Sequence, residues 1–286
     1  MIGRIRMTKF SDYGFDYTRY LNTKLEKFNS SKQYRFDATN PILNISTSCS
    51  VGILPSSTSS EVVVEIDADA KEIDNFRVWQ NRNIITVEQT GMNNSGSGIS
   101  INGVTMSGGN ASININGQNI RVVNGRTYVN GVEINGAEQS KSYREPKIRI
   151  LAPTGSNLDA NITGKGILVS KVPLQSAEIE LCSSAEVGLA AYNLYCDIQG
   201  QGSGYFIAGG GEVNINLSGQ GTIKVQGKWS AAKVSLSGMG SIMTEGTCMG
   251  DYRANVSGMG TVTHYGRVMG RIKRSLSGMG SINIQQ

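Results

Sequence analysis

A single pattern recurs through the last third of the chain at a nearly constant interval. The four clearest copies have the form Leu/Val-Ser-Gly-x-Gly-Ser/Thr-Ile/Val, and their first residues are 19, 20 and 20 positions apart. They begin at Leu217, Leu236, Val256 and Leu276, and looser copies begin at Ile162, Leu181 and Ile198. A sequence period of about 20 residues is typical of a solenoid, in which each repeat stacks on the previous one.

The repeats resemble β-strands rather than helices. They contain many β-branched residues, place glycine at fixed offsets and show no helical periodicity. A unit of this length is too short for a propeller blade or a helix pair, and it suits one coil of a parallel β-helix. The sequence therefore predicts an all-β fold, a single-stranded parallel β-helix with coils of about 20 residues.

Numbering each coil from its leading Leu, Val or Ile as offset zero shows which residues share a position. Apolar residues recur at offsets minus two, zero and six, and we expect them to point inward. Gly227, Gly246 and Gly266 share offset ten, which predicts a second corner where a positive φ is tolerated. One buried column is expected at offset twelve, formed by Trp229, Cys248 and Val268.

Composition and charge restrict the class of protein. The 286 residues include 36 glycines and only 17% charged residues, as expected for a β protein with many turns. The net charge of +5 permits a polyanionic partner without requiring one. The four cysteines lack CxxC spacing, and Cys196 and Cys248 fall at inward offsets, which favours buried thiols.

Neither a membrane-spanning segment nor an export signal is evident. No apolar run reaches the ~18 residues of a membrane helix. The first ten residues are basic but lack the apolar region of a signal peptide. We therefore leave the compartment open on the residues alone.

The first 33 residues differ from the rest of the chain. Tyr17, Leu21, Leu25 and Phe28 fall on one helical face, which predicts a short amphipathic helix. We expect this N-terminal cap segment to cover an open end of the β domain; an oligomerisation helix or a membrane-surface helix are the alternatives.

Residues 34–90 contain strand patterns whose order resembles a known family. The run Phe36-Asp-Ala38, Val51-Gly-Ile53, the strand at 61–66, Ile73-Asp-Asn-Phe76 and the strand at 84–87 is similar to the opening of the head-GIN domain family. The resemblance continues in 147–153, in 157–159 and in every Ser-Gly-x-Gly coil, and it covers most of 34–90 and 146–286. It implies a parallel β-helix, and the family's other name, putative auto-transporter adhesin, implies a surface or adhesive role.

Residues 91–145 have the pattern of an insertion. Asn-Gly pairs stand at 102–103, 116–117, 124–125, 130–131 and 135–136. Asn-Gly between β-prone residues favours tight hairpin turns. We expect a β-hairpin insertion that is weakly anchored to the core, between a first β part at 34–90 and the β-helix repeats at 146–286.

The titratable residues of the chain do not form a recognisable catalytic pattern. His264, the one histidine, lies at offset eight, which favours a structural role. Residues 217–286 contain only two acids, Glu245 and Asp251, and these are not stacked, whereas polysaccharide-cleaving enzymes need paired acids. The Gly-x-Gly turns lead into strands and not into helices, which argues against nucleotide binding. We predict no enzyme activity, no cofactor and no metal site.

Two surface ladders are the candidate contact residues. Met239, Met259 and Met279 occupy the x position of Ser-Gly-x-Gly, where they either form an exposed apolar strip or turn inward as packing. The other ladder is basic, lies at offset minus three and consists of Lys233, Arg253 and Lys273. It belongs to a stretch, 217–286, with eight basic and two acidic side chains, which favours a solvated face over a polyanion site.

The last coil carries a charge where the preceding coils carry apolar residues. Arg274 stands at offset minus two, the position of Ile215, Val234 and Ala254. A charge in a dry core is costly. We expect the edge of this coil to be covered, either by a second chain in an end-to-end homo-oligomer or by residues 1–33.

The sequence as a whole predicts a non-catalytic structural or adhesion-type binding protein that presents side-chain ladders on a rigid solenoid, with a protein or glycan as surface ligand. One alternative is a self-assembling scaffold joined end to end. A second, disfavoured by the acid count, is a polysaccharide-cleaving β-helix enzyme.

Overall fold

The structure is a computed structural model that describes residues 32–90 and 145–286, together with the strands between 98 and 133. The chain divides into two compact units, one made of residues up to 90 and from 145 onward, the other of 91–144. The amphipathic helix expected before residue 32 lies outside the described residues. No helix among the described residues is long and apolar enough to cross a membrane.

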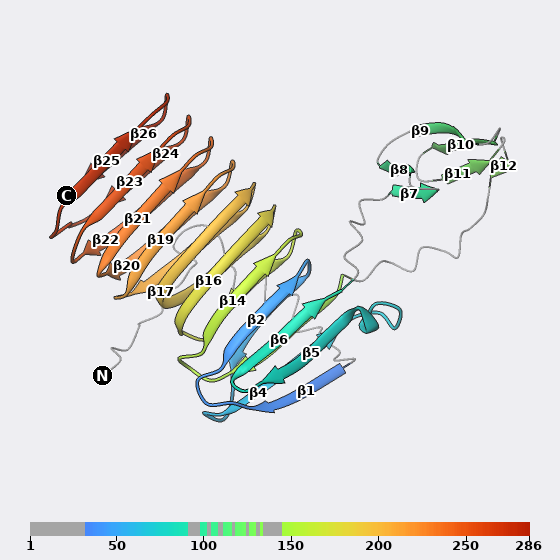
Figure 1. Cartoon of the computed structure of the whole chain (residues 1–286), viewed down its shortest axis with the longest axis horizontal. Coiled ribbons are helices and arrows are strands. Elements are labelled where there is room, and N and C mark those ends of the chain that lie inside the picture. The colour runs from blue at the N-terminus through green and yellow to red at the C-terminus, as the bar shows by residue number, and fades with distance from the viewer. Residues whose placement is uncertain are drawn as a thin grey trace. The chain divides into compact units, whose positions relative to one another are not determined.

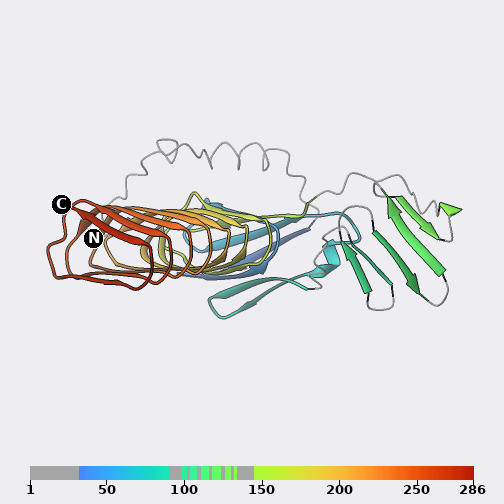
Figure 2. The same ribbon diagram turned by 90° about the horizontal axis from the view of Figure 1, so that it is seen from above.

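The larger unit is a stack of coils with two parallel sheets (Figures 1 and 2). Each coil contributes one strand to each sheet, which we call face A and face B. The stacked strands of face A are β6 (Ile84–Gln89), β2 (Ile42–Thr47), β14 (Asn157–Ile162), β16 (Leu174–Ser183), the second half of β17 (Glu186–Gly200), β19 (Glu212–Leu217), β21 (Ala231–Leu236), β23 (Tyr252–Val256) and β25 (Ile272–Leu276).

Face B is built from the strands that follow in each coil. They are β3 (Ser50–Pro55), β15 (Ile167–Ser170), the first half of β17, β18 (Ser203–Gly209), β20 (Thr222–Trp229), β22 (Ser241–Cys248), β24 (Thr261–Tyr265) and β26 (Ser281–Gln285). Stacked side chains in the regular coils lie 19 or 20 positions apart in the chain. The prediction of an all-β solenoid with this period is confirmed.

The end of the stack that contains β3 and β6 departs from a purely parallel β-helix. Here β13 (Lys147–Ala152) pairs in parallel with β3 but antiparallel with β4 (Glu61–Asp67), and β1 (Lys32–Asp37) pairs antiparallel with β4. On face A, β5 (Phe76–Asn81) folds back on β6 after the short 3-10 helix η2 (Ile73–Asn75). Face A and face B therefore both end in antiparallel strands, which the 20-residue period could not predict.

The core follows the offsets read from the sequence. Ile215, Leu217 and Ile223, at offsets minus two, zero and six, are fully buried. Cα partners join Trp229 to Cys248 and Cys248 to Val268, and all three side chains are buried, so the predicted column at offset twelve is confirmed. Cys49, Cys196 and Cys248 are buried free thiols, and burial raises the pKa of Cys49 to about 12.

The glycines of both corners are required by the stacking itself. Gly227, Gly246 and Gly266 have φ angles of 123°, 145° and 123°, which confirms the predicted second corner. A Cβ on Gly246 would lie 1.8 Å from the carbonyl oxygen of Gly227, and one on Gly238 would lie 1.9 Å from that of Gly219. Successive corners thus approach so closely that only glycine leaves room for the next coil.

The smaller unit consists of antiparallel strands. One pair is formed by β7 (Gly98–Ile101) and β8 (Val104–Ser107). The other strands, β9 (Ala111–Ile115), β10 (Gln118–Val123), β11 (Arg126–Val129) and β12 (Val132–Glu133), form a meander. In the sequence, an Asn-Gly dipeptide stands between the two strands of each pair, at 102–103, 116–117, 124–125 and 130–131.

Candidate functional site

The outer surface of face A carries two straight rows of polar side chains. Because residues alternate between the core and the surface along a strand, offsets minus two and zero point inward, while minus three and minus one point outward. The row at offset minus three, here called the charge ladder, is continuous in register through seven coils. Its members are Asp159, Glu178, Tyr195, Asn214, Lys233, Arg253 and Lys273.

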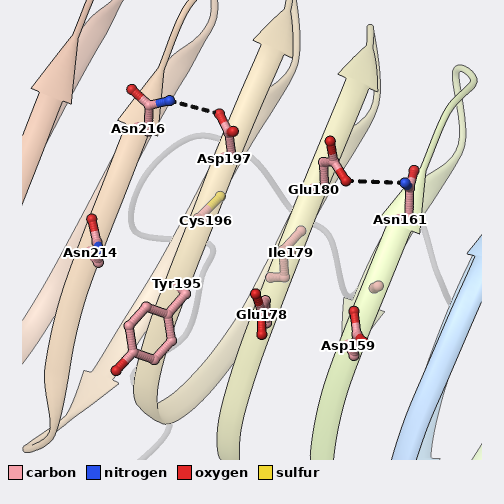
Figure 3. A pocket seen from close by; sticks show the side chains of 11 residues that line it. Asp159, Asn161, Glu178, Ile179, Glu180, Tyr195, Cys196, Asp197, Asn214 and Asn216 are labelled. Carbon is pink, nitrogen blue, oxygen red and sulfur yellow. Dashed lines mark hydrogen bonds between the residues drawn. The ribbon is translucent and has the colours of Figure 1, made fainter.

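The neighbouring row, here called the second ladder, runs parallel to it at offset minus one. Its members are Asn161, Glu180, Asp197, Asn216, Ser235, Asn255 and Ser275. Asn161 Nδ2 donates a hydrogen bond to Glu180 Oε2 over 3.2 Å, and Asn216 Nδ2 donates to Asp197 Oδ1 over 3.0 Å (Figure 3). These amide contacts hold the two carboxylates in place as hydrogen-bond acceptors.

A shallow groove of about 540 Å³ lies over β14, β16, β17 and β19 where the two ladders are acidic. Asp159, Glu178, Glu180 and Asp197 all line it, together with the ring of Tyr195. Figure 3 shows these side chains projecting from neighbouring strands of the same sheet. The groove therefore offers fixed carboxylate and amide groups beside one aromatic face.

Tyr195 connects the groove to the start of β19. Its side chain is 37% exposed, and its hydroxyl donates a hydrogen bond to Glu212 Oε2 over 3.4 Å. Partial burial, followed by the negative charge of Glu212, raises the pKa of the Tyr195 phenol. The Tyr195 phenol therefore keeps its proton at neutral pH and continues to donate to Glu212.

Charge changes sign along the charge ladder. Asp159 and Glu178 are adjacent at one end, and Lys233, Arg253 and Lys273 are stacked at the other. Like charges on directly paired residues of neighbouring strands repel each other. Arg253 Nη2 lies 4.0 Å from Asp251 Oδ2, whereas the other four have no ion pair within residues 32–90 and 145–286. Each end of the ladder is therefore a concentration of one charge sign.

The basic ladder predicted from the sequence is thus one end of the longer charge ladder. Asp159 and Glu178 lie in coils before residue 217, and they share offset minus three with Lys233. The count of two unstacked acids holds for residues 217–286, but it does not extend to the earlier coils of face A, where Asp159 and Glu178 are stacked. Extending the offset numbering into the looser coils that begin at Ile162 and Leu181 identifies both residues.

The predicted methionine ladder lies on the turns between face A and face B. Met239, Met259 and Met279 are 53%, 54% and 83% exposed, so their side chains point to solvent rather than into the core. The backbone N–H groups of Met239 and Met259 each bond to a glycine carbonyl of the preceding coil. Whether the methionines form a contact surface stays a prediction.

Arg274 does not enter the core. It pairs in register with the buried Ala254, yet its own side chain is exposed, and Leu276 beside it is 53% exposed. Within the described residues, β25 pairs only with β23, and β26 only with β24. The expected cover of this edge is thus not formed by any described residue, and its identity stays a prediction.

His264 is buried and lies beside two other polar side chains of the core. Its Nδ1 lies 3.0 Å from Thr244 Oγ1, which in turn lies 2.8 Å from the hydroxyl of Tyr252, and the His264 and Tyr252 rings are 4.7 Å apart. Burial lowers the pKa of His264 and raises that of Tyr252 to about 12. No cluster of His, Cys, Asp and Glu among the described residues has an arrangement suited to a metal ion.

Comparison with known proteins places the fold among solved structures. No protein family model and no curated protein matches the chain. A structure from Bacteroides fragilis, described as a putative adhesin, is 16% identical with a TM-score of 0.51 and covers 89% of this chain and 98% of its own. A putative lipid binding protein from Parabacteroides distasonis is 16% identical with a TM-score of 0.53 and covers 89% and 96%. At this identity the likeness shows that the chain shares their fold.

Proposed function

We propose that this chain is a non-catalytic, adhesion-type binding protein whose recognition surface is the outer side of face A. The observation that carries the proposal is the pair of ladders, in which exposed acids, amides, Tyr195 and bases are held in register on a rigid sheet. A rigid array of side chains binds a partner without an ordering cost for the backbone.

The groove favours a partner rich in hydrogen-bond donors. Glu180 and Asp197 accept bonds from asparagines of neighbouring coils and keep further lone pairs for a ligand. Tyr195 adds an aromatic face. Hydroxyl groups of a glycan or basic groups of a protein surface meet these requirements. The resemblance to the head-GIN domain family and the adhesin name of one solved structure of this fold agree with the proposal.

An array of immobilised glycans and extracellular proteins tests this function. We expect saturable binding of the labelled chain that falls about tenfold in Glu180→Ala together with Asp197→Ala. The control is Lys228→Ala, an exposed change on face B. Binding that is the same in all three proteins would contradict a recognition surface on face A.

The same incubations test the absence of catalysis. The acids of face A make polysaccharide cleavage the chemical alternative, since such enzymes use paired carboxyl groups. We expect no new reducing ends after prolonged incubation of the chain with a bound glycan. Release of reducing ends that disappears in Glu178→Gln would make the protein an enzyme.

A second candidate function is a scaffold that assembles end to end through the last coil. It is favoured by the exposed Leu276 and by the outer edges of β25 and β26, which no described strand pairs. In that case Ile282→Pro would remove an edge donor and weaken assembly, and Arg274→Ile would keep or strengthen it. Light scattering that gives the same mass for both variants at every concentration would exclude this contact.

A further inference from the structure

The charge ladder is self-complementary when it is read in reverse. Asn214 stands three coils from Asp159 on one side and three coils from Lys273 on the other; beyond Asp159 the same row continues through the uncharged Asn44 and Thr86. Outward from this centre, Tyr195 is opposed by Lys233, Glu178 by Arg253, and Asp159 by Lys273. Each acid of the charge ladder therefore has a base of the same ladder at the same number of coils on the other side of Asn214.

We propose that the partner of face A is a second copy of this chain, docked face to face with the two solenoid axes antiparallel. The twofold axis lies parallel to β19 above Asn214. This inference rests on the proposed function, since it names the partner of the same surface. It brings Asp159 opposite Lys273 of the second copy and Glu178 opposite Arg253 of the second copy, and symmetry repeats each pair.

Charge within a single chain favours this arrangement. Asp159 stacks directly on Glu178, and Lys233, Arg253 and Lys273 stack on one another, so each end repels itself. Antiparallel docking places a base over each stacked acid. Docking with parallel axes would instead place each group over its own copy, because the coils would then be in the same order. The charge pattern therefore selects the antiparallel arrangement.

The second ladder is compatible with the same axis. Glu180 meets Asn255 of the second copy, Asp197 meets Ser235 of the second copy, and Asn216 lies on the axis. These contacts join carboxylates to hydrogen-bonding groups and bring no like charges together. One residue opposes the docking, because Glu212, also on β19, faces its own copy across the axis.

The spacing of coils lets all pairs form together. Adjacent strands lie about 4.8 Å apart in both copies, so Asp159 and Lys273, at the two ends of the ladder, are separated by about 29 Å in each. With strands about 20 Å long, the docked area is roughly 600 Å² on each copy. This is below the ~800 Å² of a standard interface, so we expect an association that depends on salt.

Sedimentation velocity across a range of concentrations tests the proposal through a charge swap. Wild-type chain should form dimers at low salt and dissociate as salt is raised. Glu178→Arg alone and Arg253→Glu alone should each weaken the dimer by about tenfold or more, since each brings like charges together twice. An equimolar mixture of these two variants should recover dimers, because every cross pair is then complementary.

Two further variants test the position of the axis. Glu212→Gln should strengthen the dimer, since it removes the one repulsive pair. Lys228→Glu, which changes the charge by as much as Arg253→Glu but on face B, should leave it unaltered. All these positions except Lys228 lie on face A, and circular dichroism should show an unchanged fold in every variant.

A second, independent charge swap mixes Asp159→Lys with Lys273→Glu, and this mixture too should recover dimers.

A monomer at every concentration in low salt would overturn the proposal, and so would a dimer whose two charge variants fail to recover each other on mixing. Failure here is separable from failure of the proposed function. If no dimer forms but Glu180→Ala with Asp197→Ala still lowers binding on the array about tenfold, then face A recognises a different partner. If neither measurement responds to changes on face A, both proposals fail.

Discussion

Glycine at the corners sets how closely coils can stack, and this is testable at a single residue. In Gly246→Ala the new Cβ would be 1.8 Å from the Gly227 oxygen, at a φ of 145°. We expect the free energy of unfolding to fall by about 3 kcal/mol or more, from overlap added to backbone strain. Chemical denaturation measures the change.

Gly155→Ala is the matched control for that prediction. Gly155 also has a positive φ, 83°, but a Cβ there would meet no atom within 4 Å. Only backbone strain remains, so the loss should be about 1–2 kcal/mol. Equal losses in the two variants would show that coil stacking does not demand glycine.

His264 makes the stability of the larger unit depend on pH, with lower stability in acid. Burial lowers its pKa in the folded chain, and Nε2 has no hydrogen-bond partner among the described residues. The unfolded chain therefore binds the proton more readily, and acidification below the ordinary pKa of about 6.5 favours unfolding. Stability is retained above that pH and lost as the pH falls toward the folded pKa.

We expect the melting temperature to drop between pH 7 and pH 5 in the wild-type chain and to drop less in His264→Gln. Differential scanning calorimetry at both pH values compares them. Because this is the one histidine in the sequence, other groups contribute little to the slope in this window. Identical slopes would mean that His264 is protonated as easily when folded as when unfolded.

At the scale of single residues, the sequence predicts inward positions better than recognition sites. The column of Trp229, Cys248 and Val268 follows from a shared offset and apolar character. The charge ladder shares an offset too, but its members change from acid to tyrosine, amide and base, so no one residue type runs along its whole length. The shared offset therefore has to be followed through the looser coils before the row can be recognised.

At the scale of elements, the smaller unit is predicted to be dispensable for the solenoid. Its strands pair only among themselves, and the flanking strands β6 and β13 belong to the stack. Replacing residues 93–143 by a short linker should therefore leave cooperative unfolding, with a melting temperature within a few degrees of that of the full chain. Thermal denaturation followed by circular dichroism checks this, and a broad, non-cooperative transition would show that the insertion supports the core.

The antiparallel strands at the N-terminal end of the stack could not be predicted from the repeat. Periodicity reports contacts between neighbouring coils, whereas β4 and β13 pair although the whole insertion lies between them in the sequence. The ion pair between Arg149 and Glu65 joins residues 84 positions apart. Nothing in the local pattern of either strand specifies a partner so far away, although Val62–Ile66 reads clearly as a strand.

At the scale of the whole unit, each coil contacts only its neighbours, so stability is expected to vary along the stack. Residues 271–286 are exposed or half-buried, while β20 and β22 have coils on both sides. Amide hydrogens of β25 and β26 should exchange at least about tenfold faster than those of β20 and β22. Mass spectrometry of peptides from these strands checks it; uniform protection would indicate a covered end.

The position of β3 in the stack affects the order in which the strands form during folding. It lies between β13 and β15, and Ile167 N donates to Ser50 Oγ, 117 positions away, whereas the coils from β19 onward join residues 19 or 20 positions apart. Short loops close faster than long ones. Pulse-labelled hydrogen exchange during refolding should therefore protect β20 and β22 before β2 and β3, and the reverse order would contradict this. On the ribosome, β2 and β3 are made early but must wait for β13 to β15 before they gain neighbours on both sides.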